Sequence, residues 1–445
     1  MSFRTIATLA ATGCLVGALV SSAQAQQAPA AAPAAPAAPA APAHPVWTDP
    51  IFGGIQFSGH VEASANLSTA NPTNNINFGQ GFNDRANTVR MNQAMINIEH
   101  DLDSSKNIFQ YGFKFTGMYG TDARYTHFFN EFDRVTKSPY QWDIVELDAQ
   151  LHAPTPLTGG GTDMKIGQYP TPLGYEVIDA TGNPFYTHSY QFLYSLPFKH
   201  TGVLTTTHLN DAVDLWLGWD TGVNDSLGVN GVNNGSIGKF IAGFGLNGLL
   251  DGNLTILALA HVGPENPYTQ GAAITVPDPN RHDRQFYDTV ITYTINKAWT
   301  SVTELNYVKD DQFHADAESA TTYLEYKFSD QWRFNGRAEI YRDNQGFFVT
   351  TPTSSLDVIN AERGFPVTGA NYNFGKATYD EFTINAVWSP PVALPGTLGL
   401  TIRPEARLDT AYGGNGGTKV YNVGPSGTGR DSTVGTFSVD AILSF

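Results

Sequence analysis

Hydrophobic and polar residues alternate with a period of two over much of the chain. In the segment 331–341 the two sets fall on opposite faces, with Trp332, Phe334, Gly336, Ala338 and Ile340 on one and Arg333, Asn335, Arg337 and Glu339 on the other. Successive side chains of a β-strand point to opposite faces, so this period predicts strands rather than helices. Segments 398–409 and 437–445 show the same alternation. Weaker examples lie at 52–66, 87–101, 109–120, 143–153, 162–169, 198–206, 212–220, 238–248, 252–262, 285–295, 298–309, 319–328 and 378–389.

These segments number about sixteen, and each is long enough for a tilted strand to cross a bilayer. After Trp47 there is no apolar run of the length, about 18 residues, that a transmembrane helix needs. Short connections alternate with long ones, and the long ones lie near 67–86, 121–142, 170–197, 221–237, 263–284, 310–318, 343–377 and 410–434. This order predicts an all-β fold: a single transmembrane, antiparallel, up-and-down β-barrel with short periplasmic turns and long extracellular loops. A strand number between about 14 and 18 fits the pattern. A soluble β-sandwich or propeller would also alternate, but it would not sort its connections by length.

The first 50 residues differ from the rest. Residues 1–25 combine Arg4, an apolar run and a small-residue end at Ala23 and Ala25, which is typical of a cleaved secretory signal peptide. Residues 26–50 are rich in Ala and Pro, which favours an extended periplasmic tether over a folded domain. We therefore expect a barrel over 51–445 that is exported to the outer membrane of a Gram-negative bacterium.

Composition narrows the possible chemistry. The 445 residues include 41 acidic and 25 basic side chains, for a formal net charge of −16, which argues against nucleic acid as a partner. Cys14, the single cysteine, lies in the predicted signal peptide, so neither disulfides nor thiolate metal sites are expected in the mature chain. No histidine pair has metal-ligand spacing on a helix, and no serine lies in a nucleophile-elbow context. The sequence predicts no enzyme, no cofactor and no metal.

Several short motifs add a family resemblance. They are MKIGQY at 164–169, Gly174-Tyr175-Glu176, Asn183, Ser189-Tyr190 and LPFKHTGV at 196–203. In this order and spacing the chain resembles the β-barrel porin type 2 family of bacterial outer-membrane proteins, over most of its length after about residue 51. The resemblance implies the barrel fold and the outer-membrane location more firmly than any particular solute.

Charged residues on the polar strand faces are the first candidate site. A charge facing lipid costs a few kcal/mol, so we expect these residues to face the lumen. The candidates are Arg90, Lys114, Arg333, Arg337, Glu339, Arg403, Glu405 and Arg407. The four arginines from 333 to 407 come from two strands with one strand between them. They either form a cationic patch on the wall or pair with Glu339, Glu381 and Glu405 as cross-strand neighbours.

The long connection 170–197 is the second candidate. In 16-stranded general porins the loop after strand 5 folds inward and narrows the channel. By that resemblance, Glu176 and Asp179 would face the arginines across the lumen and create a transverse field that favours small polar solutes. If the connection covers the barrel from outside, the two acids have no such role.

The sequence thus predicts a porin that allows passive diffusion of small hydrophilic solutes or ions through a water-filled barrel. The alternatives are a non-conducting structural or surface-binding barrel whose lumen is filled by loops 170–197 and 343–377, and an outer-membrane hydrolase with a site built from distant strands. The expected partners are outer-membrane lipid and small hydrophilic solutes, and a homotrimer is expected by analogy with general porins.

Overall fold

The computed structural model describes residues 47–48, 54–73, 75–102, 108–128, 131–132, 139–155, 158–226, 238–266, 269–270, 274–275, 278–349, 351–352, 371–372, 375–391, 399–414, 419–424 and 428–445. The predicted signal peptide and almost all of the predicted tether lie outside these residues. The central part of the predicted loop 343–377 does so too.

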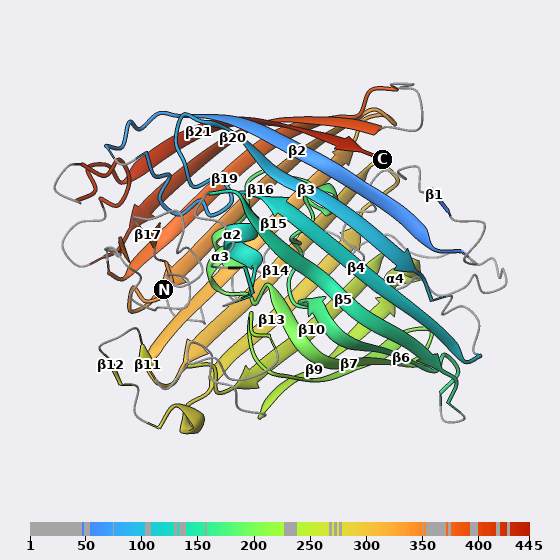
Figure 1. The fold of residues 1–445 in the computed structure, drawn as a ribbon. Helices are drawn as coiled ribbons and strands as arrows, with labels where there is room; N and C mark the ends of the chain where they lie inside the picture. The colour runs from blue at the N-terminus through green and yellow to red at the C-terminus, as the bar shows by residue number, and fades with distance from the viewer. Residues whose placement is uncertain are drawn as a thin grey trace, which may run out of the picture.

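Sixteen long antiparallel strands form a closed barrel (Figure 1). Each strand pairs with its neighbour along the chain, and β21 pairs with β2 to close the cylinder. The strands are β2 Gln56–Ser68, β3 Val89–His100, β4 Gln110–Gly120, β5 Gln141–Ala153, β6 Thr162–Pro170, β7 Lys199–Asn210, β8 Val213–Asp220, β9 Lys239–Gly248, β10 Leu254–Gly263, β13 Arg284–Thr294, β14 Trp299–Asp310, β15 Ala315–Lys327, β16 Trp332–Asp343, β19 Ala377–Trp388, β20 Gly399–Tyr412 and β21 Thr433–Ser444. The predicted fold class and strand number are confirmed.

The remaining elements are short. Three two-residue pairings involve β1 Trp47–Thr48 against β2, β11 Thr269–Gln270 against β12 Ile274–Thr275, and β17 Thr351–Pro352 against β18 Asn371–Tyr372. The helical turns are α2 Ala123–Thr126, α3 Tyr190–Tyr194, α4 Leu249–Gly252, η1 Ala180–Gly182 and η2 Pro279–Arg281. Within the described residues, no helix combines the length and the apolar character needed to cross a membrane.

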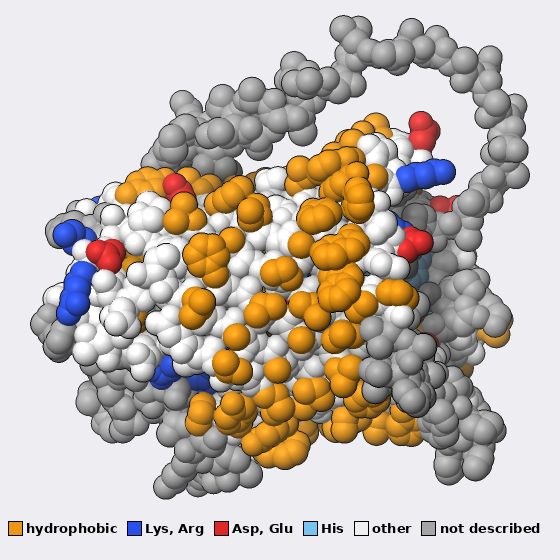
Figure 2. Space-filling model, turned by 90° about the horizontal axis from the view of Figure 1, so that it is seen from above, with side chains coloured by type: hydrophobic (Ala, Val, Ile, Leu, Met, Phe, Trp, Pro, Cys, Tyr) orange, Lys and Arg blue, Asp and Glu red, His pale blue; other side chains and the backbone are white. Residues whose placement is uncertain are grey.

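Burial on the barrel wall is the reverse of that in a soluble protein. Apolar side chains point outward, where Phe437 is 58% exposed and Phe382 is 53% exposed, whereas Arg337 on the inner face is fully buried. Figure 2 shows apolar side chains spread over the outer surface, with most of the visible charged side chains near its two margins. The strands therefore alternate between a face that suits lipid and a face that suits polar groups.

The prediction of a long connection at 310–318 is wrong. Strand β14 ends at Asp310 and β15 begins at Ala315, so only four residues form the turn. The inward positions at the start of β15 hold Ala315 and Ala317, and the alternate positions hold Asp316 and Glu318. Small and acidic residues give a weak hydrophobic alternation, which is why the pattern locates the strand start four residues too late.

Candidate functional site

The connection 171–198, called here the internal loop, lies inside the barrel. Its aromatic residues Phe185, Tyr186, Tyr190 and Phe192 are each at most 3% exposed. Figure 1 shows its helix α3 near the middle of the barrel. Helix α3 begins at the N-cap Ser189, whose side chain accepts a hydrogen bond from the Phe192 N–H. A serine cap satisfies an amide that the first helical turn leaves without a partner. The local sequence thus forms the turn, and the barrel wall holds it in place.

Two wall carboxylates accept hydrogen bonds from successive backbone N–H groups of the internal loop. Both Glu339 on β16 and Glu405 on β20 are nearly fully buried. The four bonds are Tyr190 N to Glu339 Oε2 at 2.7 Å, Gln191 N to Glu339 Oε1 at 2.8 Å, Tyr186 N to Glu405 Oε2 at 2.9 Å and Thr187 N to Glu405 Oε1 at 3.2 Å. Each carboxylate therefore fixes two successive residues of the loop backbone to the wall.

Three wall arginines donate to the loop carbonyls. The bonds run from Arg337 Nη1 to Thr187 O at 2.6 Å, from Arg403 Nη1 to Asn183 O at 2.7 Å and from Arg407 Nη1 to His188 O at 2.5 Å. Each guanidinium also pairs with a wall carboxylate, at Glu381, Asp440 and Asp409 respectively. A guanidinium offers five N–H donors, so one side chain can bridge the wall and the loop.

The structure agrees in part with the pairing interpretation of the arginines, because Arg337, Arg403 and Arg407 each contact a wall carboxylate. Arg337 pairs with Glu381 across β16 and β19 at 2.9 Å, as the cross-strand interpretation expects. Glu339 and Glu405, however, serve the loop backbone. Arg333 is half-buried and lines a cavity with Asn183, Thr401 and Arg403 near the short-turn end.

The two acids of the internal loop occupy different places. Glu176 Oε1 lies 2.6 Å from Arg337 Nη1, so this acid is in direct contact with the arginine instead of across a gap. Asp179 caps η1 by accepting from Thr181 N at 2.8 Å, and its Oδ1 lies 3.7 Å from His60 Nδ1. The expectation that Asp179 faces the arginines is not met, because the turn at η1 directs its carboxylate toward β2.

The remaining two candidates lie on other strands. Lys114 on β4 is 3.3 Å from Glu99 and 3.6 Å from Glu146, both on adjacent strands of the inner wall. Arg90 on β3 is 2.6 Å from Asp84, which belongs to the connection 69–88.

The connection 69–88 also enters the barrel, which the sequence analysis did not predict. Asp84 binds the buried Arg124 of α2 at 2.9 Å, and Gln80 Nε2 donates to Asp409 Oδ2 at 3.0 Å. Burial by itself would raise the pKa of Asp84, but Arg124 and then Arg90 hold this pKa below its usual value. The signal available in the sequence was weak, namely the apolar side chains Phe78 and Phe82 among Gly and Asn.

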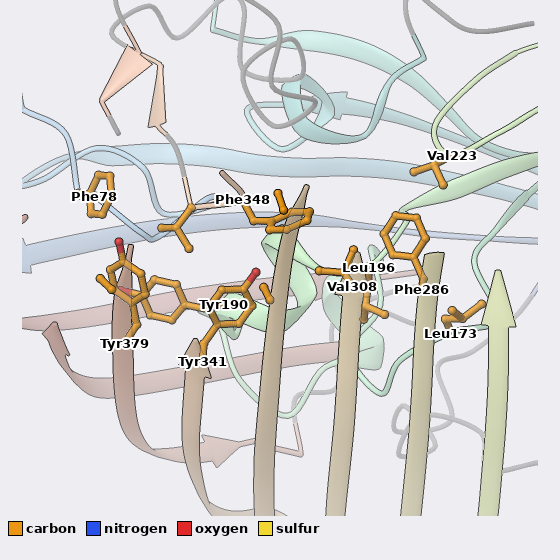
Figure 3. Packing of buried hydrophobic residues seen from close by; sticks show 14 of the residues in the cluster. Phe78, Leu173, Tyr190, Leu196, Val223, Phe286, Val308, Tyr341, Phe348 and Tyr379 are labelled. Carbon is orange, nitrogen blue, oxygen red and sulfur yellow. The ribbon is translucent and has the colours of Figure 1, made fainter. Parts of the chain in front are cut away.

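An aromatic cluster joins the loops to the wall (Figure 3). The ring centroid of Tyr190 lies 4.9 Å from that of Tyr379 on β19, and Tyr190 Oη lies 3.0 Å from Tyr421 Oη. Phe78 packs edge-on against Tyr421, with 6.3 Å between the two ring centroids. Phe78, Tyr190 and Tyr421, which come from three separate connections, therefore pack with Tyr379 of β19 in one core inside the barrel.

His188 lies in the same region in its neutral form. Its ring packs at 4.4 Å from Phe192 and 4.7 Å from Phe82. Burial first, and the positive charge of Arg337 second, hold the pKa of His188 well below its usual value. Asn183 Nδ2 lies 3.4 Å from His188 Nε2 and can donate to it. The internal loop therefore carries a histidine that resists protonation.

Two solved structures show the same fold. The anion-selective porin from Comamonas acidovorans is 9% identical, with 88% of this chain and 99% of that chain covered and a TM-score of 0.53. OprB from Pseudomonas putida is 10% identical, with 87% and 93% covered and a TM-score of 0.51. At these identities the likeness shows the fold alone. Among curated protein sequences, none matches this chain significantly. Residues 54–445 match the family described as "Putative beta-barrel porin-2, OmpL-like", and because this match covers most of the chain, the protein belongs to that family of β-barrel porins.

Proposed function

We propose that this protein is an outer-membrane channel through which small hydrophilic solutes or ions diffuse passively. The family is one of β-barrel porins, and a closed barrel of sixteen strands is wide enough for an aqueous passage. The inner wall carries buried charges of both signs, among them Glu146, Arg403 and Asp440. A polar wall of this kind favours solutes that hydrogen-bond over lipophilic ones.

The observation that carries this proposal is the anchoring of the internal loop. Its backbone is tied to β16 and β20 by hydrogen bonds to Glu339, Glu405, Arg337, Arg403 and Arg407. A loop that is bonded to the barrel wall at several points narrows the passage at a fixed place. The bonds keep the loop from moving across the opening. We infer that the internal loop is the constriction and that these five wall residues set its position.

A second candidate function is a non-conducting barrel that serves as a structural or surface-binding protein. The specific observation in its favour is the shared aromatic core of Phe78, Tyr190 and Tyr421, in which side chains from three connections meet inside the barrel. Under this alternative the loops fill the lumen, and the polar wall serves to hold them.

The proposal includes export through a cleaved signal over residues 1–25, a tether over 26–50, contact of the outer face with lipid, and assembly as a homotrimer. It assigns the barrel no catalytic role and no nucleic-acid partner. The apolar outer face, with Leu408 49% exposed, supports the contact with lipid.

Single-channel recording of the detergent-folded protein in a planar bilayer tests the two candidates. Discrete conductance steps that scale with KCl concentration are expected for the channel, and the reversal potential in a salt gradient gives the sign of its selectivity. Protein that is heat-modifiable on a gel, and therefore folded, but gives no steps at any voltage would refute the channel and support the loop-filled barrel.

A further inference from the structure

Three buried side chains meet at the long-loop end of β7, β8 and β10. They are His200, Asp220 and His261, and each of their side chains is 0% exposed. Asp220 Oδ2 lies 3.3 Å from His200 Nδ1 and 3.1 Å from His261 Nε2. The three ligand atoms all lie within 4.8 Å of one another. Two imidazole nitrogens and a carboxylate oxygen therefore converge on one point.

These separations suit a tetrahedral metal. Zn²⁺ binds nitrogen and oxygen at about 2.0–2.2 Å, which places neighbouring ligand atoms of a tetrahedron about 3.3 Å apart. Both measured separations lie close to this value. His200 Nδ1 is fully buried and faces Asp220 Oδ2 at 3.3 Å, and His261 Nε2 lies 3.1 Å from both oxygens of the same carboxylate. Two buried imidazole nitrogens that share one carboxylate form a donor set that Zn²⁺ prefers.

The groups behind the three side chains hold them in orientations that suit a metal. His200 Nε2 lies 3.0 Å from Thr171 Oγ1, and His261 Nδ1 lies 3.9 Å from Glu265 Oε1. The Gly222 N–H donates to Asp220 Oδ1 at 2.8 Å; this oxygen also lies 3.1 Å from His261 Nε2, whereas Oδ2 faces both rings. A metal-bound histidine commonly donates its second ring N–H to an oxygen acceptor; Thr171 Oγ1 can serve His200 in this way, whereas Glu265 is too far from His261 Nδ1 for a direct hydrogen bond.

Lys239 on β9 is the nearby positive charge. Its Nζ, Glu265 Oε2 and Asp225 Oδ2 each lie within 3.0 Å of the position that a Cβ on Gly222 would take, so the three atoms surround Gly222. Two acids other than Asp220 therefore lie near the charge of Lys239.

We propose that His200, Asp220 and His261 form a Zn²⁺ site that ties three strands together at the base of the internal loop. Thr171 begins this loop and His200 follows its end, so the metal fixes both ends of the loop to β8 and β10. The site departs from the sequence expectation of no metal, because its ligands lie on three strands and not on one helix.

Zinc binding to the full-length protein without a polyhistidine tag tests the site. The folded protein is stripped with EDTA, dialysed against Zn²⁺ and assayed for bound metal, and one equivalent per chain is expected. His200→Asn, His261→Asn and Asp220→Asn should each abolish this equivalent, and Glu265→Gln should weaken binding about 10- to 100-fold. His208→Gln is the matched control, since His208 lies between the carboxylates of Asp163 and Asp214 at the other end of the barrel. It should leave binding unchanged.

X-ray absorption of the zinc-loaded wild-type protein gives a readout that does not depend on any variant folding. Two imidazole ligands are expected in the spectrum. A wild-type barrel that binds no zinc, or whose bound zinc has no imidazole ligand, overturns the proposal. Binding that persists equally in His200→Asn and His261→Asn overturns it as well. None of these outcomes depends on whether the barrel conducts.

Discussion

Replacing Arg337 with alanine should release the internal loop from the barrel wall. In the structure this guanidinium contacts Glu176 at 2.6 Å, Glu381 at 2.9 Å and the Thr187 carbonyl at 2.6 Å. The side chains of the two carboxylates are only 2% and 0% exposed. Removing the cation takes the nearest positive partner from both buried acids, leaves Glu381 with Arg407 Nε at 4.0 Å, and costs the loop a bond at its centre.

The magnitude follows from the burial of these charges. Breaking a buried ion pair by removing one partner costs about 3–5 kcal/mol. Because each 1.4 kcal/mol is tenfold, a loss of about 3 kcal/mol shifts the equilibrium between the anchored and the released loop by more than about 100-fold. Adding Glu176→Gln to Arg337→Ala should recover part of this loss, since one of the stranded charges is then neutral.

Amide hydrogen exchange over residues 186–191 measures this equilibrium, and single-channel recording shows its effect on the passage. Exchange should accelerate by about the factor above, and conductance should rise and become noisier. Arg333→Ala is the matched control, because Arg333 lies four residues away on the same strand and is only half-buried. If Arg337→Ala leaves loop exchange at the wild-type rate, the reasoning that this arginine anchors the loop is refuted.

Three further predictions concern the outer wall, the aromatic core and pH. Phe382→Arg, in the middle of β19 on the outer face, should lower the free energy of unfolding in lipid vesicles by about 2–4 kcal/mol; unchanged stability would contradict the contact of this face with lipid. Tyr190→Phe removes the hydroxyl beside Tyr421 and should cost about 0.5–1.5 kcal/mol in chemical unfolding, and a stabilised variant would contradict this hydrogen bond. The pKa of His188 in the anchored loop lies below its usual value of about 6.5. As pH falls through that value, His188 therefore binds a proton in the released loop before it does so in the anchored loop, which favours release. Acidification should therefore speed exchange of the loop amides after correction for intrinsic rates, and His188→Gln should remove that extra effect.

The sequence by itself determined the barrel, because the residues of each strand carry the alternating pattern that locates that strand. Lipid outside and polar groups inside select for opposite residue types at successive positions, so the period of two is a local signal. Strand β16 is predicted at 331–341 and observed at Trp332–Asp343. The signal weakens where inward residues are small, as with Ala315 and Ala317 at the start of β15. The same pattern places Arg337, Arg403 and Arg407 on the inner face, where the structure has them.

Only the tertiary structure decided which groups meet inside the barrel. The roles of Glu339 and Glu405 as acceptors for the internal loop depend on a loop that lies about 150 to 220 residues away along the chain. Asp179 was predicted to face the arginines, but the η1 turn directs it elsewhere. His200, Asp220 and His261 come together because β7, β8 and β10 are near neighbours in the closed sheet. Such contacts are set by the path of loops and the register of strands, and neither has a repeating pattern in the sequence that could reveal it.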